Sequence, residues 1–388
     1  MTRFSGRVPR SLTPNRLSEA RASLGEVPFD LTVNNPTRCD LPYPKTLLEA
    51  LADPGGLDYR PDSAGPPATR RAIASVYDQW GAEVDPSSIL ITGSTSEAYS
   101  LLFKLLCDPG DAVLVPTPSY PLFDQLSRLD GVVTTSFDLD PQDDWRPDLG
   151  QIAAASEQTR AVILVHPNNP TGSHIHPEDA TAIVSLCRDR GWALIADEVF
   201  LPYRLDGGPG AGRSFAATTD CLSFTLGGLS KMAGLPQIKL AWIVLGGSDN
   251  ARRSALERLD YIADAYLSVS TPVALAGPRL MVGALTVRAA ISDRCRRNLE
   301  VLRRASAELP AVTVPVVGGG WSALLRLPTI MDDEELALHL LTERGVAVQP
   351  GYFFDLPDDG TFVLSLLTPE PVWRDGLAAI FETVRTWL

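Results

Sequence analysis

A lysine stands directly after a glycine-rich turn in the stretch GGLSK, residues 227–231. A short apolar strand is predicted just before this turn, so we expect Lys231 at the end of a buried strand. A lysine amine that is kept from water can form a Schiff base with an aldehyde. Asp197 ends another predicted strand, WALIADE, and its carboxylate could hold the protonated nitrogen of a heterocycle.

A phosphate site is predicted at the start of a helix. Ser94, Thr95 and Ser96 follow the predicted strand SSILITG and begin an amphipathic segment. The N–H groups and the positive dipole end of a helix N-terminus, together with hydroxyl side chains, favour a phosphate monoester. A second lysine, Lys239, comes eight residues after Lys231, and we expect it to return toward the phosphate as a counter-charge.

Two further side chains follow predicted strands of the same kind. Tyr120 comes after DAVLVP, and its ring could stack on a planar cofactor. Asn169 comes after AVILV, and its amide could donate to a phenolate oxygen. A Schiff-base lysine, a carboxylate, a stacking ring, an amide and an anion cradle are what pyridoxal phosphate requires. The sequence therefore predicts this cofactor.

Each of these residues also has a purely structural interpretation. Asp197 could cap a helix, Tyr120 could be only a turn residue between prolines, and Lys231 could be a surface lysine after a glycine turn. Their shared position at strand ends favours the cofactor site over these separate explanations. For His166 and Trp321 we expect only packing in the core or in the wall of the site.

The elements that must position these side chains are apolar strands alternating with amphipathic helices between residues 67 and 246. This pattern is typical of an α/β fold with a mostly parallel sheet covered on both faces. Ligands of such sheets bind outside the carboxyl ends of the strands. We expect a large cofactor-binding domain at 36–285, and a smaller α+β domain formed by 1–35 and 286–388.

Composition limits the remaining possibilities. The 388 residues carry 34 Lys and Arg against 47 Asp and Glu, a net charge of −13 that disfavours binding to nucleic acid or anionic membranes. The N-terminus has no signal-peptide pattern and no apolar run could span a bilayer, so we expect a cytoplasmic protein. The five cysteines lack any CxxC pair, and no His/Cys cluster predicts a metal site.

The chain resembles the class I/II aminotransferases of fold type I over nearly its whole length. The resemblance rests on seven stretches in the family's order: YRPDSAG, GSTSEA, PSYP, HPNNPTG, ADEVF, GLSK and VAVQPGYFF. It implies a fold type I pyridoxal-phosphate-dependent transferase, a small-molecule amino donor and a carbonyl acceptor. The implied roles are Schiff-base lysine for Lys231, ring-nitrogen partner for Asp197, ring-oxygen contact for Asn169, stacking ring for Tyr120, and phosphate contacts for Ser94, Thr95 and Ser96.

The resemblance also implies a homodimer, because Tyr59 would reach the phosphate in the partner subunit. Several positions depart from the family's pattern. Phe200 replaces a tyrosine that would donate to the ring oxygen, and Gly228 replaces a serine, which leaves Ser230 as a lesser candidate. Lys239 stands in place of an arginine, so the phosphate would meet a point charge instead of a planar fork.

Two further positions that differ from the family's pattern concern the binding of the substrate. Asn34 replaces a glycine in the N-terminal loop, and Val363 stands where the family places the arginine that binds the substrate carboxylate. A buried carboxylate without a partner costs several kcal/mol. Either the substrate lacks that carboxylate or another cation binds it, and Arg38 in NNPTRCD is our candidate. Arg38 could equally be a solvated surface residue.

The sequence therefore predicts an aminotransferase that uses Lys231 and Asp197 in catalysis, with substrate contacts from Asn34, Arg38 and Asn169. The alternative is a lyase, or a decarboxylating or deaminating enzyme of secondary metabolism, with the same cofactor and fold. A cofactor-binding regulator is disfavoured, because the chain has no spare segment for a DNA-binding extension.

Overall fold

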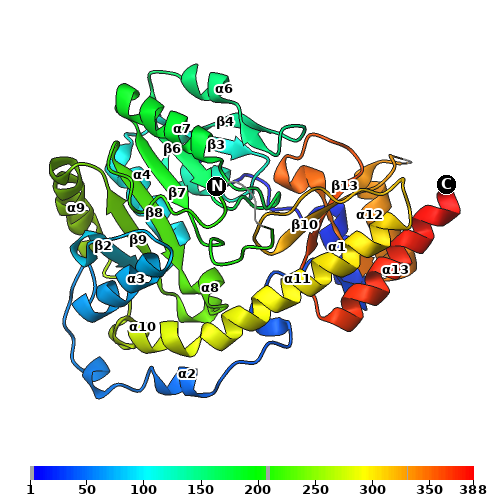
Figure 1. The fold of residues 1–388 in the computed structure, drawn as a ribbon, viewed down its shortest axis with the longest axis horizontal. Coiled ribbons are helices and arrows are strands. Elements are labelled where there is room, and N and C mark those ends of the chain that lie inside the picture. The colour runs from blue at the N-terminus through cyan, green and yellow to red at the C-terminus, as the bar shows by residue number, and fades with distance from the viewer. Residues whose placement is uncertain (1–3, 207–209, 330) are drawn as a thin grey trace.

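The computed structural model describes residues 4–206, 210–329 and 331–388. An eight-stranded sheet with the order β2-β9-β8-β7-β6-β3-β4-β5 forms its larger part (Figure 1). Strands β8, β7, β6, β3 and β4 run parallel to one another, whereas β9 is antiparallel to both of its neighbours and β5 is antiparallel to β4. The strands are β2 (Ile89–Thr92), β3 (Ala112–Thr117), β4 (Val133–Asp140), β5 (Arg146–Pro147), β6 (Thr159–Val165), β7 (Ala193–Asp197), β8 (Ser223–Gly228) and β9 (Ala241–Gly246).

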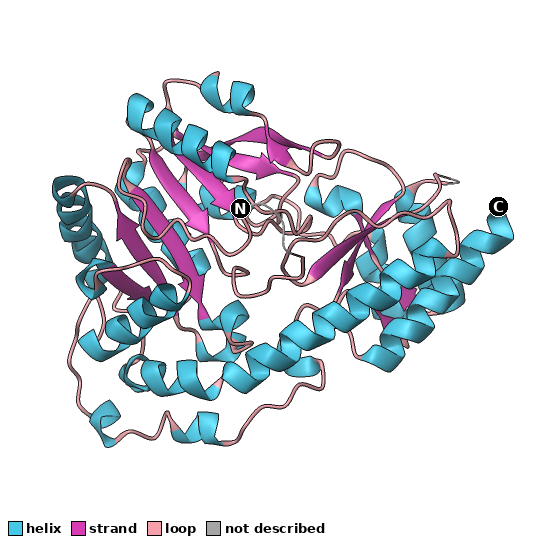
Figure 2. Ribbon diagram, viewed as in Figure 1, coloured by secondary structure: helices cyan, strands magenta, loops and turns pink. Residues whose placement is uncertain are grey.

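Helices cover both faces of this sheet (Figure 2). On one face, α4 and α9 pack in an apolar cluster with Ile195 and Phe224. On the other face, α3 and α10 pack against Trp242, and α7 packs against Leu194. Ile195 and Leu194 are neighbours on β7, and successive strand residues point to opposite faces. The helices are α3 (Pro67–Gln79), α4 (Thr95–Leu106), α5 (Phe123–Asp130), α6 (Leu149–Ala153), α7 (Pro177–Arg190), α9 (Asp249–Asp264) and α10 (Thr271–Gly283).

The connection between β8 and β9 sets the direction of β9, which runs antiparallel to the strand on either side of it. The chain leaves β8 into the single-turn helix α8 (Leu229–Met232), passes the 3-10 turn η4 (Pro236–Ile238), and returns beside the strand it left. It has no long crossover helix of the kind that parallel neighbours need. Strand β9 is therefore antiparallel to β8, and α8 lies at the carboxyl end of β8.

The C-terminal part of the chain forms two smaller sheets, with strand orders β10-β13-β12 and β1-β11. The long helix α11 extends from α10 toward them (Figure 1), and α1 packs on α12. Because β1 pairs with β11, the N-terminal segment packs with the C-terminal part; the domain limits predicted from the sequence stay a prediction. The elements are α1 (Arg16–Leu24), β1 (Phe29–Asp30), β10 (Ser322–Arg326), β11 (Val346–Ala347), β12 (Gln349–Pro350), β13 (Thr361–Ser365), α11 (Leu285–Ala307), α12 (Asp333–Arg344) and α13 (Glu370–Trp387).

Short helical turns fill the remaining loops. They are η1 (Pro36–Arg38), α2 (Thr46–Glu49), η2 (Pro54–Leu57), η3 (Pro86–Ser88) and η5 (Gly351–Phe354). Within the described ranges, no single helix has the length and apolar composition to cross a membrane. The helices α10 and α11 meet that criterion only as a pair, which is bent by 53°.

Close packing between β8 and β9 explains why a glycine stands at position 228. A Cβ atom at Gly228 would lie 3.0 Å from the Cβ of Ala241 and 3.3 Å from its Cα. The serine that the family usually carries here would therefore be tightly packed, and β9 would have to shift by a few tenths of an ångström. The residue opposite thus favours a glycine at this position.

We expect Gly228→Ala to lower the free energy of unfolding by about 1–3 kcal/mol, since overpacking strains a buried strand pair. Ala241→Gly removes the closest of the two contacts, so the double variant should lose less stability than the sum of the two single variants. Urea denaturation of the parent, both single variants and the double variant measures this coupling. Strict additivity would contradict the packing explanation.

Candidate active site

Three of the predicted site residues lie at the carboxyl ends of adjacent strands. Asp197 is the last residue of β7, Lys231 lies on α8 just after β8, and Asn169 lies in the loop after β6. Strands β6, β7 and β8 are parallel neighbours, and Asp197 is paired with Val165 on one side and Leu226 on the other. The fold therefore brings the lysine, the carboxylate and the amide to one edge of the sheet.

The Asp197 carboxylate is held by a donor at each oxygen. Tyr99 donates its hydroxyl to Oδ2 at 3.0 Å, and the backbone N–H of Val199 donates to Oδ1 at 3.2 Å. Part of the side chain is accessible, yet the surrounding protein removes most of its solvation. This desolvation raises the pKa of Asp197 to about 6, against the opposing effects of the two hydrogen bonds and of the Lys231 charge.

Lys231 lies against an aromatic wall. Its Nζ atom is 5.2 Å from the ring centroid of Trp321 and 5.8 Å from that of Phe200. Burial lowers the pKa of Lys231 while the charge of Asp197 opposes the shift, so desolvation favours the neutral, nucleophilic amine. Phe200 therefore lies beside the lysine, where the missing tyrosine hydroxyl was expected.

The backbone beneath Lys231 is fixed by Tyr203, which is fully buried. Its hydroxyl donates to the carbonyl oxygen of Lys231 at 2.7 Å and to that of Met232 at 3.2 Å. These carbonyls belong to the last turn of α8, and that of Lys231 also accepts a hydrogen bond from the N–H of Gly234 at 3.1 Å. Tyr203 also packs edge-on against Trp321, with ring centroids 5.2 Å apart.

Asn169 is oriented by a residue from the smaller sheet. The hydroxyl of Ser322, the first residue of β10, donates to Oδ1 of Asn169 at 3.2 Å. With Oδ1 used as an acceptor, the NH₂ group of Asn169 is available as a donor. This arrangement suits the predicted contact between the amide and a ring oxygen.

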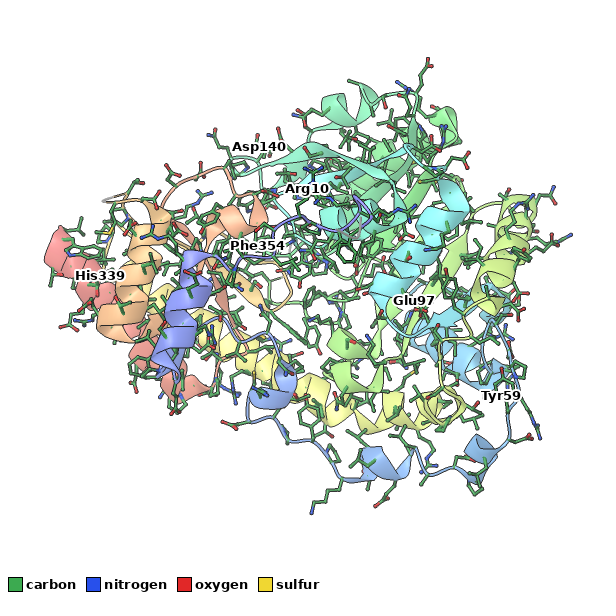
Figure 3. The ribbon with its side chains drawn as sticks, turned by 180° about the vertical axis from the view of Figure 1, so that it is seen from behind. Arg10, Tyr59, Glu97, Asp140, His339 and Phe354 are labelled. Carbon is green, nitrogen blue, oxygen red and sulfur yellow. The ribbon has the colours of Figure 1, made fainter. Side chains whose placement is uncertain are left out.

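The predicted phosphate cradle is the N-terminus of α4. Ser94 is the N-cap, and its side-chain oxygen accepts a hydrogen bond from the N–H of Glu97 at 3.1 Å. The Glu97 carboxylate accepts from the N–H of Gly93, which closes the turn (Figure 3). Thr95 and Ser96 follow the cap, and all these residues are half-buried. The N–H groups of a first helical turn lack intrahelical partners and can bind an anion.

Other predicted residues make no side-chain hydrogen bond or ion pair with Lys231 or Asp197 among the described residues. Tyr120 is 48% exposed and borders a hollow beside Asp124 and Asp355. Lys239 is exposed and has a left-handed backbone conformation, with φ of 58°. Tyr59 is 74% exposed and lies at the edge of the molecule in Figure 3. Ser230, beside Lys231, is half-buried. Their roles toward the cofactor stay predictions.

The candidate substrate residues lie in the loop after β1. Asn34 and Arg38 are both exposed, and Val363 is buried in an apolar cluster with Leu324 and Phe354. Position 363 therefore carries no cation, and its side chain packs among apolar neighbours.

Two anchors tie the loop of Asn34 and Arg38 to the end of β13. The Ser365 hydroxyl donates to the carbonyl of Val33 at 2.6 Å. Arg294 Nη1 donates to the carbonyl of Cys39 at 3.2 Å and to that of Leu367 at 3.3 Å. Ser365 is two residues beyond Val363 on the same strand, so the loop adjoins the strand from which the clamp arginine is missing.

Tyr99, Ser322 and the ring of Trp321 beside Lys231 were not predicted as site residues. Trp321 was expected only to pack, and it does so directly against the lysine amine. Tyr99 offered a weak signal, since it is a polar aromatic residue on the buried side of the helix that begins at Ser94. Ser322 offered none, because its partner Asn169 is 153 residues away in the chain.

The donor set fits pyridoxal phosphate. It comprises a desolvated amine for an aldehyde, an oriented carboxylate for a ring nitrogen, an amide donor for a ring oxygen, and a helix N-terminus for a phosphate. These groups lie at the carboxyl ends of β6, β7 and β8 or just beyond them, and on α4, so the sheet and this helix set their relative positions.

Comparisons with known proteins identify the family of the chain. The family model described as aminotransferase class I and II matches residues 27–372. An alanine aminotransferase from Mycobacterium tuberculosis is 27% identical over 369 residues, which cover 92% of this chain and 85% of the relative. A capreomycidine synthase from Streptomyces vinaceus is 32% identical over 300 residues, which cover 77% of this chain and 75% of the relative.

The fold has a close match among solved structures. An alanine aminotransferase from Pyrococcus furiosus superposes with a TM-score of 0.85 at 23% identity, covering 95% of both chains. That identity is low, so the superposition supports the fold alone. The predicted α/β fold of type I and the predicted cofactor are both confirmed. The chain belongs to the class I and II aminotransferase family, and it is a pyridoxal-phosphate-dependent aminotransferase.

Proposed function

We propose that the chain transfers the amino group of an α-amino acid to a 2-oxo acid in the crevice formed by Lys231, Asp197 and Asn169. The observation that carries this proposal is the position of the Lys231 amine, next to an aromatic wall at a strand end adjoining that of the oriented Asp197 carboxylate. Bound pyridoxal phosphate supplies an electron sink for the substrate carbon that carries the amine.

Lys231 has two roles in this proposal. Its amine would bind the aldehyde of the cofactor, and when free it would serve as the base that takes a proton from the substrate carbon bearing the amine. A base for this task must be neutral at working pH, and burial lowers the pKa of Lys231 in that direction. The backbone bond from Tyr203 keeps the amine aimed at the crevice.

The remaining cofactor contacts complete the proposal. Asp197 keeps the ring nitrogen protonated, Asn169 donates to the ring oxygen, and Tyr120 stacks on the ring. Because Phe200 has no hydroxyl, the ring oxygen receives one donor fewer than the family's pattern provides. The phosphate contacts are Ser94, Thr95, Ser96, Ser230 and Lys239, with Tyr59 of the partner subunit.

The substrate carboxylate is bound by Arg38, with Asn34 and Asn169 as polar contacts. Two facts support this choice: an apolar cluster surrounds Val363, and hydrogen bonds anchor the loop of Arg38 beside the strand that carries Val363. The relatives named alanine aminotransferase support a small α-amino acid as donor.

A homodimer in the cytoplasm completes the proposal. Several large apolar and aromatic side chains near Tyr59 are exposed in the single chain, including Leu57 at 94% and Tyr266 at 56%. Tyr59 and Tyr266 line the same hollow. Exposed groups of this kind mark a protein interface, and a second copy would cover them while placing Tyr59 at its neighbour's phosphate.

Lys231 and Lys239 allow a matched test of the cofactor assignment. Borohydride reduction followed by peptide mass spectrometry should locate the cofactor on Lys231 in the parent and in Lys239→Ala. Lys231→Ala should show no covalent cofactor and no conversion of alanine to pyruvate. Lys239→Ala should bind the cofactor more weakly, because one phosphate counter-charge is lost. Covalent cofactor on another residue in Lys231→Ala would overturn the assignment.

Arg38 can be tested against Lys45, an exposed lysine of the same loop region. Arg38→Ala should lower kcat/KM for α-amino acids by about 10- to 100-fold, as expected for the loss of a charge-assisted hydrogen bond. Affinity for the cofactor, read from its absorbance, should not change, and Lys45→Ala should behave like the parent. Unchanged kinetics in Arg38→Ala would exclude this residue as the carboxylate ligand.

A further inference from the structure

We propose that Tyr99 is the positioning residue for the carboxylate that holds the cofactor ring nitrogen, and that α4 sets the position of the phosphate and of this carboxylate together. The inference rests on the proposed function of Asp197. It adds a residue that the family motifs in this sequence do not include.

The contact between Tyr99 and Asp197 is fixed from both sides. The Tyr99 ring is 2% exposed. It packs edge-on against Phe123, with centroids 5.4 Å apart, and in a tilted arrangement against Phe103, with centroids 6.0 Å apart. These contacts restrict the ring, so the direction of its hydroxyl is restricted as well. The hydroxyl lies 3.0 Å from Oδ2 of Asp197.

Among the described residues, each side-chain oxygen of Asp197 accepts one hydrogen bond. Tyr99 donates to Oδ2, and the N–H of Val199 donates to Oδ1. A carboxylate oxygen accepts about two hydrogen bonds, so lone pairs remain for a third donor. The pair of donors fixes the plane of the carboxylate, and therefore the direction in which those lone pairs face the cofactor ring nitrogen.

Helix α4 connects this carboxylate to the phosphate cradle. Its N-cap is Ser94, and Tyr99 lies five residues further along the same helix. A rise of about 1.5 Å per residue makes this segment short and stiff. A cofactor held by its phosphate at the N-terminus of α4 and by its ring nitrogen at Asp197 would therefore be located by contacts that share one rigid element.

The Tyr99 hydroxyl affects the balance between the ionised and the protonated form of Asp197. The titratable groups near this carboxylate are Tyr99 on α4, Lys231 on α8, Glu198 next to it, and Tyr77 on α3. Burial raises the pKa of Tyr99 well above its usual value, so it stays protonated and remains a donor. The hydroxyl stabilises the ionised carboxylate, which burial otherwise disfavours. Without it, the proton shared with the ring nitrogen moves toward the carboxylate.

The test is Tyr99→Phe in the holoenzyme, reconstituted with cofactor that carries ¹⁵N at the ring nitrogen. The ¹⁵N signal should move toward its unprotonated position, and kcat should fall by about 10- to 100-fold, as expected for the loss of a hydrogen bond to a charged group. An unchanged ¹⁵N signal in Tyr99→Phe would overturn the inference.

Two further variants separate positioning from a general structural effect. Tyr77→Phe removes another fully buried hydroxyl, one that accepts from Trp242 on the opposite face of the sheet. It should lower stability and leave the ¹⁵N signal unchanged. In an Asp197→Asn background, Tyr99→Phe should no longer affect the signal, since the hydroxyl acts through the carboxylate. An equal effect in both backgrounds contradicts the inference.

The parent protein distinguishes a failure of this inference from a failure of the proposed function. If the parent shows no covalent cofactor on Lys231 after reduction, the proposed function is wrong. If the parent has the cofactor and Tyr99→Phe matches it in both signal and kcat, then only the role of Tyr99 is wrong.

Discussion

The site depends on the interaction between a carboxylate and an amine that both lie in poorly solvated surroundings. Burial shifts Asp197 and Lys231 toward their neutral forms, raising the pKa of the carboxyl to about 6 and lowering that of the amine. Their mutual attraction opposes both shifts. The surrounding residues adjust this balance: Tyr99 stabilises the carboxylate charge, while the rings of Phe200 and Trp321 limit the solvation of the amine.

Parallel strands explain how residues so far apart in sequence come to lie at one edge of the sheet. The carboxyl ends of β6, β7 and β8 lie at that edge, so Asn169 after β6, Asp197 at the end of β7 and Lys231 on α8 after β8 are brought to one place. The alternation of strands and helices was sufficient to predict this, because it depends on apolar periodicity and on local turn signals. The reversal of β9 was less visible, since it depends on how the chain returns after α8.

The supporting contacts could not be predicted, and the reasons differ. The bond between Ser322 and Asn169 joins residues 153 positions apart and depends on how the smaller sheet meets the larger one. The bond from Tyr99 depends on the ring direction set by Phe123, which no periodicity encodes. The preference for a glycine at position 228 depends on the residue opposite it on β9. Each contact is a matter of side-chain direction across elements, whereas sequence patterns report mainly which face of an element is buried.

The departures from the family's pattern are matched by changes in their surroundings. Phe200 lies against Trp321, with ring centroids 5.3 Å apart, so the position without a hydroxyl is filled by an apolar contact. Val363 lies in an apolar cluster with Leu324 and Phe354, in place of the polar surroundings that an arginine would need. The altered positions are thus packed as parts of this protein's own core.

Glu198, the residue after Asp197, makes the stability of the folded protein depend on pH. It is 2% exposed, accepts hydrogen bonds from the Ser214 hydroxyl and the Phe215 N–H at 2.6 Å each, and burial raises its pKa to about 8. In the unfolded chain the same carboxyl would ionise near its ordinary value of 4.5. Between these two pKa values, the folded protein therefore holds a proton on Glu198 that the unfolded chain has released. Folding takes up a proton in this pH range. By linkage, Glu198 contributes its full stabilisation below the lower pKa and loses it as the pH rises through the higher one. A rise in pH from about 4.5 to about 8 thus lowers the stability of the fold at the residue next to Asp197.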